Sequence, residues 1–294
     1  MKWLIIFGAL GLAMAGFAYW FFAQSPPRQL DTINNLLPGD GNAKLLVDNQ
    51  VYDDELGLAV NIWSPKNTES KPLPVVIFIH GGGWDSGSKD EYGFAGRAFA
   101  HRGYMTVLID YRLYPDVKFP AFLQDSAKAV AWVHDNIASL GGDPDRIFLS
   151  GHSAGAYNVV MLALDRQWLE RLGKSSNLIK GVAALAGPYD FYPFDSDRTK
   201  NSFGAYNLPA MTQPINFARA DAPPLWLATG LDDTQVKPRN SRILRDKMRE
   251  VGGVAQYREY DNLDHAEIIM AVSKPFRGKG PVLDDMIAFF ESRK

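Results

Sequence analysis

The sequence of 294 residues contains no cysteine. This absence excludes disulfide bonds, a thiol nucleophile and metal sites built on thiolates. An excess of basic residues is also missing, because 31 lysines and arginines stand against 33 aspartates and glutamates, giving a formal net charge of −2. Phosphate backbones are bound chiefly by such an excess, so we do not expect this chain to bind nucleic acid.

Internal repeats and low-complexity tracts are absent as well. With 46% hydrophobic residues, the composition excludes a disordered, collagen-like or repeat protein. A chain of this length hides roughly three quarters of its unfolded surface on folding. The sequence therefore has enough apolar material for one large domain.

Charge is missing from one long run near the N-terminus, residues 3–23, which reads WLIIFGALGLAMAGFAYWFFA. As a helix this run would be about 31 Å long, close to the thickness of a bilayer core. It is longer than the apolar part of a cleaved signal, which has about 7–15 residues. The aromatic residues at 19–22 suit a membrane–water interface. We therefore expect residues 1–24 to form a membrane anchor, with a cleaved signal segment and a secreted protein as the alternative.

The flanking charges predict the orientation of this anchor. Lys2 precedes the apolar run, whereas Arg28 and Asp31 follow it. The positive-inside rule then places the N-terminus in the cytoplasm and the main domain outside it, in the periplasm. Residues 25–45 are rich in Pro, Asn, Gly and Asp, which predicts a linker with a short helix around residues 32–37.

From residue 46 onward, short apolar runs alternate with amphipathic stretches. Several of the runs are continuously apolar, which is typical of strands covered on both faces in a parallel sheet. The pattern predicts a doubly wound, mostly parallel α/β sheet with helices on both faces, in one catalytic domain over residues 46–294. The predicted strands are 58–63, 75–80, 105–110, 147–150, 179–185, 225–229 and 255–260, and the predicted helices are 121–140, 241–251 and 282–292.

A Gly-x-Ser-x-Gly motif follows the predicted strand 147–150 and precedes a run that can form a helix. Its residues are Gly151-His152-Ser153-Ala154-Gly155. A sharp strand–turn–helix elbow holds a nucleophilic serine at the carboxyl edge of a sheet, and the glycines avoid collisions with neighbouring backbone. The pattern therefore makes Ser153 the candidate nucleophile. A closely packed Gly/Ser-rich turn without a chemical role is the alternative.

Three consecutive glycines follow the apolar strand 75–79, in His80-Gly81-Gly82-Gly83-Trp84. Such a run costs backbone entropy, so a function for its N–H groups is expected. We assign the N–H groups of Gly82, Gly83 and Ala154 to an oxyanion hole, which holds the negative charge that develops during acyl transfer. The loop lacks the GK[ST] ending of a phosphate-binding loop. His80, at the strand end, is expected to order the loop.

A serine hydroxyl needs a base, and the five histidines are candidates for it. His265 follows the predicted strand 255–260, late in the chain, as the order serine, acid, histidine requires. The acid should follow a strand between the other two residues. Both Asp232 and Asp233 follow the strand 225–229, and spacing does not choose between them.

Four motifs together resemble the α/β-hydrolase fold: HGGGW at 80–84, DYRLYP at 110–115, GGDPDRIFLSGHSAGA at 141–156, and GLDDTQV at 230–236 with the later DH at 264–265. More narrowly, they are similar to the carboxylesterases that join the hormone-sensitive-lipase-like and the feruloyl-esterase/formamidase-like (BD-FAE-like) branches. The resemblance spans about residues 46–294. The family pattern Gly-x-x-Asp-x-x-Val implies Asp233 rather than Asp232. The elbow GHSAGA, and the lack of a cap-helix pair before the sheet, favour the BD-FAE-like branch.

Residues 187–221 are aromatic, rich in proline and irregular, which predicts a lid or a wall of the acyl pocket. Four apolar residues are candidates for substrate binding: Trp84 of the glycine loop, Tyr189, Phe191 and Phe203.

These residues predict a serine hydrolase that cleaves carboxylic esters, small or short in their acyl group, through an acyl-enzyme at Ser153. The expected partners are a small-molecule ester and, through the N-terminal helix, a membrane. The chemistry requires no metal and no cofactor. An amidase such as an arylformamidase is the alternative enzyme, and a non-catalytic binding protein of the same fold is the alternative outside enzymes.

Overall fold

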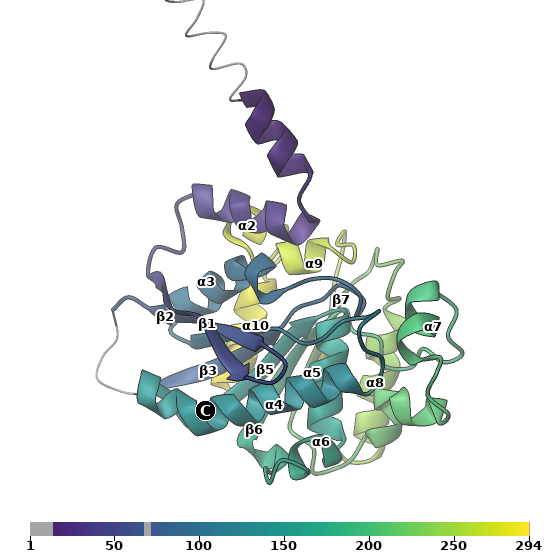
Figure 1. The fold of residues 1–294 in the computed structure, drawn as a ribbon. Helices are drawn as coiled ribbons and strands as arrows, with labels where there is room; N and C mark the ends of the chain where they lie inside the picture. Colours follow the sequence, from purple (N-terminus) through teal and green to yellow (C-terminus); the bar gives the residue numbers. More distant parts are fainter. Residues whose placement is uncertain (1–13, 68–71, 294) are drawn as a thin grey trace, which may run out of the picture.

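The computed structural model describes residues 14–67 and 72–293. These residues form a twisted sheet with helices on both faces (Figure 1). The strand order in the described part is β1-β2-β4-β3-β5-β6-β7-β8. The strands β3 to β8 pair in parallel, whereas β1 with β2 and β2 with β4 are antiparallel. The strands are β1 Ala43–Asp53, β2 Leu58–Pro65, β3 Leu73–Ile79, β4 Met105–Ile109, β5 Gly142–His152, β6 Ile179–Leu185, β7 Leu225–Gly230 and β8 Ala255–Tyr260.

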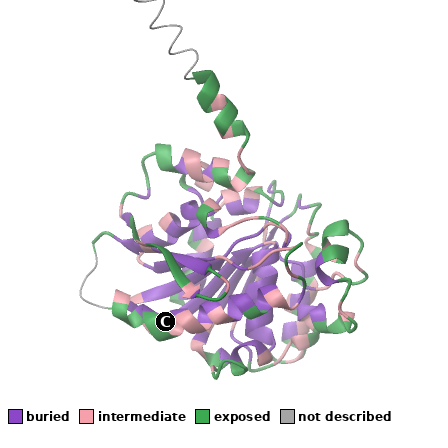
Figure 2. Ribbon diagram, viewed as in Figure 1, coloured by how far each residue is buried: buried purple, intermediate pink, exposed green. Residues whose placement is uncertain are grey.

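This architecture confirms the predicted doubly wound, mostly parallel sheet. The central strand β3 shows why its sequence is continuously apolar. Val75 and Ile77 belong to one core cluster, whereas Val76 and Phe78 belong to the cluster on the opposite face. Both faces of the sheet are therefore buried under helices, as the burial colours of Figure 2 show.

The helices include the three that the apolar spacing predicts. The predicted helix at 121–140 is α4 followed by a short 3-10 turn at Ile137–Leu140, and Gly141, at φ 92°, ends it. The helices of the folded body are α2 Pro26–Leu36, α3 Gly93–His101, α4 Ala121–Asn136, α5 Ala154–Leu164, α6 Gln167–Glu170, α7 Asp197–Phe203, α8 Arg239–Glu250, α9 Glu267–Met270 and α10 Val282–Glu291.

The sequence pattern does not predict strand β1. It lies at the edge of the sheet, most of its residues are exposed or half-buried, and its pairing with β2 is broken by register shifts. An irregular edge strand does not show the regular alternation of buried and exposed residues that marks a strand in a sequence.

The segment predicted as a linker holds helix α2, which begins at Pro26 rather than near residue 32. The helix packs on the domain. Leu30 is buried, and Asp31 forms an ion pair with Arg97 of α3. Asn34 accepts a hydrogen bond of 2.9 Å from the backbone N–H of Lys274. Residues 26–36 are therefore part of the folded body, which a reading of composition alone does not reveal.

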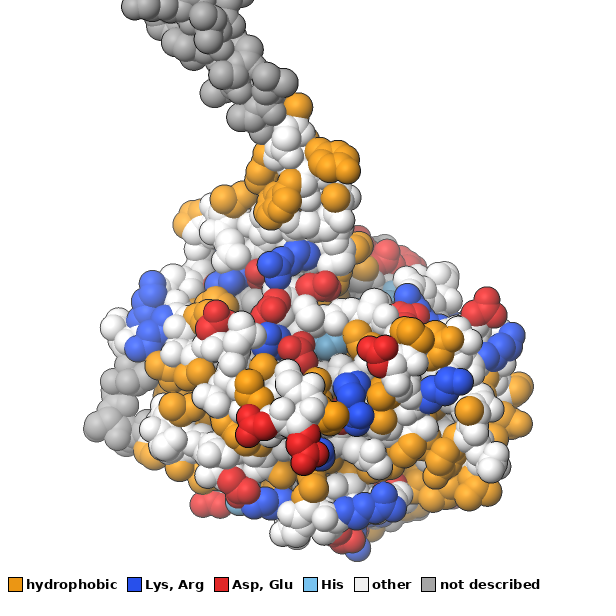
Figure 3. Space-filling view, in the orientation of Figure 1, with side chains coloured by type: hydrophobic (Ala, Val, Ile, Leu, Met, Phe, Trp, Pro, Cys, Tyr) orange, Lys and Arg blue, Asp and Glu red, His pale blue; other side chains and the backbone are white. Residues whose placement is uncertain are grey.

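A second helical stretch, residues 14–22, precedes α2 and exposes apolar and aromatic side chains above a body of mixed charge (Figures 1 and 3). The predicted anchor covers residues 1–24, of which 1–13 lie outside the described residues. Within the described part of the chain, no helix has both the length and the apolar character needed to cross a bilayer.

Candidate active site

The chain turns sharply at Ser153. Strand β5 ends at His152, helix α5 begins at Ala154, and Ser153 between them has φ 55° and ψ −118°. A non-glycine residue with positive φ is uncommon and is held only by its surroundings. The predicted strand–turn–helix elbow is thus present, with Ser153 at its tip.

The two glycines of the elbow are required by crowding. A Cβ atom on Gly155 would lie 2.0 Å from the carbonyl oxygen of Ile79, and one on Gly151 would lie 2.5 Å from the carbonyl carbon of Gly155. Real Cβ atoms do not approach backbone so closely. The close packing of α5 against the end of β3 explains Gly155, and the close packing of the first turn of α5 against the end of β5 explains Gly151, as the sequence predicts.

Three loops bring Ser153, His265 and Asp233 together. The Oγ of Ser153 lies 2.9 Å from Nε2 of His265, to which it can donate its proton. On the other side of the ring, Nδ1 of His265 donates to Oδ2 of Asp233 across 2.7 Å. These loops follow β5, β8 and β7, whose carboxyl ends meet at the same edge of the sheet. The structure thus joins the three predicted residues in one chain of hydrogen bonds.

Asp233 is held as an orienting carboxylate. Its second oxygen, Oδ1, accepts the backbone N–H groups of Gln235 at 2.9 Å and Val236 at 2.8 Å. Its side chain is fully buried. The neighbouring Asp232 is exposed and makes none of these contacts. Asp233, the residue that the family resemblance implied, is therefore the one of the two aspartates that contacts His265.

The glycine-rich loop that follows β3, called the oxyanion loop below, spans residues 80–86. Gly82 has φ 114°, and a Cβ atom there would lie 2.1 Å from the carbonyl oxygen of Ser86. That turn is closed by Ser86, whose N–H and Oγ both donate to the carbonyl oxygen of Gly82, at 3.1 and 2.8 Å. Gly82 and Gly83 line the same cavity as Ser153. Ala154 is the first residue of α5, so its N–H has no partner within the helix.

His80 packs against this loop and is bonded to its backbone. Its ring is buried and stacks on Tyr111, with centroids 4.3 Å apart and planes inclined by 13°. Its Nδ1 donates to the carbonyl oxygen of Gly81 across 2.7 Å. Burial lowers the pKa of His80 below its ordinary value. These contacts agree with the loop-ordering role expected of His80.

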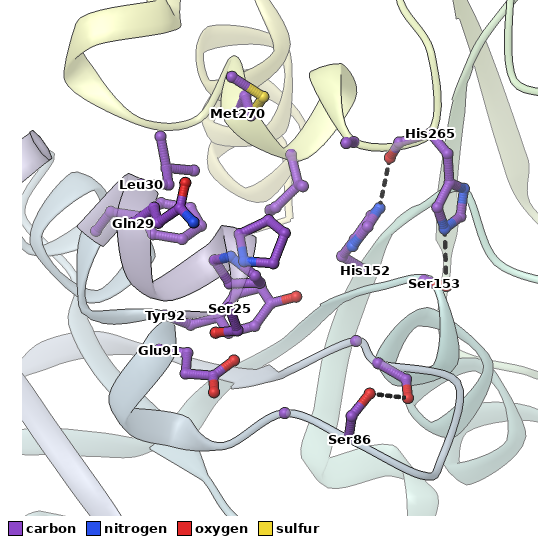
Figure 4. Close-up of a pocket in the computed structure, with 18 of the residues that line it drawn as sticks. Ser25, Gln29, Leu30, Ser86, Glu91, Tyr92, His152, Ser153, His265 and Met270 are labelled. Atoms are coloured by element: carbon purple, nitrogen blue, oxygen red, sulfur yellow. Dashed lines mark hydrogen bonds between the residues drawn. The ribbon is translucent and has the colours of Figure 1, made fainter. Parts of the chain in front are cut away.

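His152, within the elbow, has a role that the sequence did not reveal. Its Nε2 donates to the carbonyl oxygen of His265 across 2.8 Å, and the two rings lie 4.8 Å apart (Figure 4). Burial, with a smaller contribution from the nearby His265, lowers the pKa of His152 to about 3, so its ring stays neutral. The elbow motif alone does not predict this contact, because the contact joins residues 113 positions apart in the sequence.

Two of the four predicted pocket residues do not line the cavities around Ser153. Tyr189 and Phe203 are fully buried and face neither cavity. Trp84 and Phe191 do line a cavity, although Trp84 is only 3% exposed. The correction has a packing reason. Tyr189 and Phe203 belong to the main core cluster on one face of the sheet, in which Phe203 contacts Trp84 edge-on at 4.7 Å.

Two cavities meet at Ser153 and His265. The first, of about 570 Å³, lies between the oxyanion loop, α2 and α9 (Figure 4). The second, of about 820 Å³, lies between residues 188–199 and residues 234–240. Arg198 of α7 borders both and pairs with Asp85 across 2.8 Å. Within the described ranges, no three His, Asp or Glu side chains are grouped to hold a metal ion.

The sequence is similar to a known protein family and to named relatives. The BD-FAE family model matches residues 60–248 of the chain. The chain is 27% identical over 260 residues to isoprenylcysteine alpha-carbonyl methylesterase ICME of Arabidopsis thaliana, covering 81% of this chain and 60% of that protein. It is 38% identical over 148 residues to carboxylesterase NlhH of Mycobacterium tuberculosis, covering 49% and 44%. The chain thus spans about 60% of the length of the plant relative.

The fold is also similar to solved structures. A truncated carbohydrate esterase from gut microbiota superposes with a TM-score of 0.76 at 21% identity, covering 87% of this chain and 98% of the other. At that identity the likeness supports the fold alone.

Proposed function

Because the chain belongs to the BD-FAE family, we propose that it is a carboxylesterase that uses Ser153 as its nucleophile. The observation that carries the proposal is the hydrogen-bonded chain from Ser153 through His265 to Asp233, with distances of 2.9 and 2.7 Å. Relatives named as carboxylesterases and esterases support the same reaction class. Conversion of an ester into an acid and an alcohol is therefore the reaction that we propose.

In the first half of the reaction, Oγ of Ser153 attacks the ester carbonyl while Nε2 of His265 takes its proton. Asp233 holds the ring in the tautomer that leaves Nε2 free to accept, and stabilises the imidazolium that forms. The carbonyl oxygen becomes an oxyanion, to which the N–H groups of Gly82, Gly83 and Ala154 donate. One such donor contributes about 3–4 kcal/mol to lowering the barrier.

In the second half, the imidazolium of His265 gives its proton to the leaving alcohol oxygen, and the carbon–oxygen bond breaks. The acyl group then remains on Ser153. Water attacks this acyl-enzyme, His265 accepts the proton of the water, and the oxyanion donors act again. Return of that proton to Ser153 releases the acid and restores the enzyme. Every proton in the cycle passes through His265.

The substrate that we propose is a carboxylic ester with a small or short acyl group. We further propose that the uncharged run at 3–23 anchors the protein in a membrane, with the catalytic domain outside the cytoplasm. The exposed Phe17, Tyr19, Trp20 and Phe22 support this, because aromatic side chains gather at membrane interfaces.

A fluorophosphonate probe tests the nucleophile. We expect covalent labelling of Ser153, located by peptide mass spectrometry, and loss of both labelling and p-nitrophenyl acetate hydrolysis in Ser153→Ala. Full activity of that variant would falsify the assignment. Esters of graded acyl length, compared with N-formyl aromatic amines, test the proposed preference. Faster cleavage of the formamides would identify an amidase instead.

Extraction of membranes at alkaline pH tests the anchor. The full-length protein should stay in the membrane pellet and be released by detergent. Recovery of a soluble protein that starts near residue 24 would indicate a cleaved segment instead.

A further inference from the structure

The first cavity extends from Ser153 to a wall of hydrocarbon side chains. In Figure 4, Ser153 and His265 lie at one side of the cavity, and Leu30 of α2 and Met270 of α9 lie at the other. The apolar wall is shared by α2 and the C-terminal segment: Pro27, Leu30, Ile33, Ile269, Met270 and Phe276. A ligand that reaches this wall from Ser153 meets mainly carbon.

Several polar groups around this cavity already have partners within the protein. Nε2 of Gln29 donates to the carbonyl oxygen of Gln24 at 2.9 Å, and Oγ of Ser86 donates to Gly82 at 2.8 Å. Groups satisfied in this way do not require a polar ligand beside them. His152, which also lines the cavity, remains neutral; its Nε2 donates to the carbonyl oxygen of His265, whereas its buried Nδ1 has no partner.

The α2 wall is fixed before any ligand arrives. Arg28 donates to the carbonyl oxygen of Asp90 at 2.9 Å, and Asp31 pairs with Arg97. At the other end of the helix, Asn34 is bonded to the backbone of Lys274. Because these three contacts hold α2 in place, the cavity is formed without a ligand. The cavity volume of about 570 Å³ falls in the range of small-molecule sites.

The second cavity is less suited to binding a hydrocarbon chain. It is bordered by Asp190, Asp195, Arg198, Lys237 and Arg239, whereas the charged residues of the first cavity are Glu91 and Arg198. A chain laid over such groups would strip water from them without replacing its hydrogen bonds. The second cavity is therefore lined by more charged residues than the first. The reacting carbonyl at Ser153 lies where the two cavities meet.

We propose that the cavity between α2 and α9 binds a hydrocarbon chain of the ester substrate. The inference rests on the proposed esterase function and adds the substrate class, an ester that carries an alkyl chain. Ala266, Ile269 and Met270 of this cavity follow His265, which in the proposed mechanism protonates the leaving alcohol. This placement, with the proposed short acyl group, assigns the chain to the alcohol portion of the ester.

Two series of esters test this with the full-length protein. Acetates of ethanol, butanol, hexanol and octanol extend the alcohol, and p-nitrophenyl acetate, butyrate, hexanoate and octanoate extend the acyl group. We expect kcat/KM to rise about fourfold for each added methylene in the alcohol series until the cavity is full, and to stay flat or fall in the acyl series. A rise confined to the acyl series would overturn the assignment to the alcohol.

A pair of substitutions on α2 tests the location. Ile33→Trp narrows the cavity, whereas Leu36→Trp adds the same bulk at a position that is exposed and does not line it. We expect Ile33→Trp to lower the ratio of kcat/KM for octyl acetate to that for ethyl acetate at least tenfold, and Leu36→Trp to keep the wild-type ratio. Equal ratios in the two variants, at matched melting temperatures, would overturn the assignment to this cavity.

The two proposals fail in different ways. Absence of turnover with every ester refutes the esterase function, whereas turnover that does not depend on chain length in either series refutes the chain-binding cavity alone. Calorimetric titration of Ser153→Ala with octanol and ethanol measures the cavity without turnover. Octanol should bind more tightly, and adding Ile33→Trp should remove that advantage. Equal affinity for the two alcohols refutes the cavity as a chain site.

Discussion

His152 donates its Nε2 proton to the carbonyl oxygen of His265 across 2.8 Å, so one histidine of the elbow fixes the backbone of the histidine proposed as the base. Ser153 and His265 belong to loops 112 residues apart in sequence. The contact ties these loops together directly beside the hydrogen bond through which the proton must pass. The relative position of nucleophile and base therefore depends on a neutral imidazole.

A neutral, buried His152 makes stability depend on pH. Its folded pKa of about 3 lies below its ordinary value of 6.5, so the unfolded chain binds the additional proton between these values. The stability it contributes is complete above pH 6.5 and is lost as the pH falls toward 3. Urea unfolding should show that His152→Gln, which keeps a donor but does not titrate, loses roughly 2 kcal/mol less than the wild type between pH 7 and pH 5. Parallel losses in the two proteins would contradict this.

The acid of the triad can be tested with adjacent aspartates. Asp233→Asn should lower kcat by about 10⁴-fold, because an amide can hold His265 in the tautomer whose Nε2 cannot accept the serine proton. Asp232→Asn is the matched control, since that side chain is exposed and lies outside the hydrogen-bonded chain. Steady-state kinetics with p-nitrophenyl acetate measure both. A large loss in Asp232→Asn alone would reverse the assignment.

The sheet and the serine elbow were predictable because each depends on local sequence. Continuous apolar runs mark strands covered on both faces, as in β3. The glycines at 151 and 155 mark a turn too crowded for side chains. Spacing left Asp232 and Asp233 open, because the choice depends on which carboxylate the loop turns toward His265. Only the resemblance to a family pattern pointed to Asp233 before the contacts were known.

Helix α2 and the pocket residues show what the sequence could not supply. The composition of residues 25–45 suggests a linker, but the ion pair of Asp31 with Arg97 joins groups 66 residues apart and has no local signal. Aromatic character likewise predicts that Tyr189 and Phe203 are apolar contacts, without saying whether their partner is a substrate or another ring. Long-range packing decides both cases.

The crowding at the elbow predicts a large difference between two glycines. In Gly155→Ala the new methyl group would lie 2.0 Å from the carbonyl oxygen of Ile79, whereas Gly278 has no neighbour within 4 Å of the same position. We expect Gly155→Ala to destabilise the fold by more than about 3 kcal/mol or to prevent soluble expression, and Gly278→Ala to change stability by less than about 1 kcal/mol. Thermal unfolding compares them. Similar melting temperatures would mean that α5 can move away from β3 at little cost.

Two phenylalanines of the segment 187–221 can be used to distinguish core packing from substrate binding. Phe203 is fully buried among Trp84, Phe119 and Phe122, so truncation to alanine should leave a void and cost about 3–5 kcal/mol of unfolding free energy. Phe191 is half-buried and faces the second cavity. Phe191→Ala should therefore be less destabilising and should act mainly by raising KM. Denaturant unfolding and steady-state kinetics on both variants measure these effects. If Phe203→Ala instead kept its stability and raised KM, that ring would contact substrate, and the lid would have to open further than its aromatic packing implies.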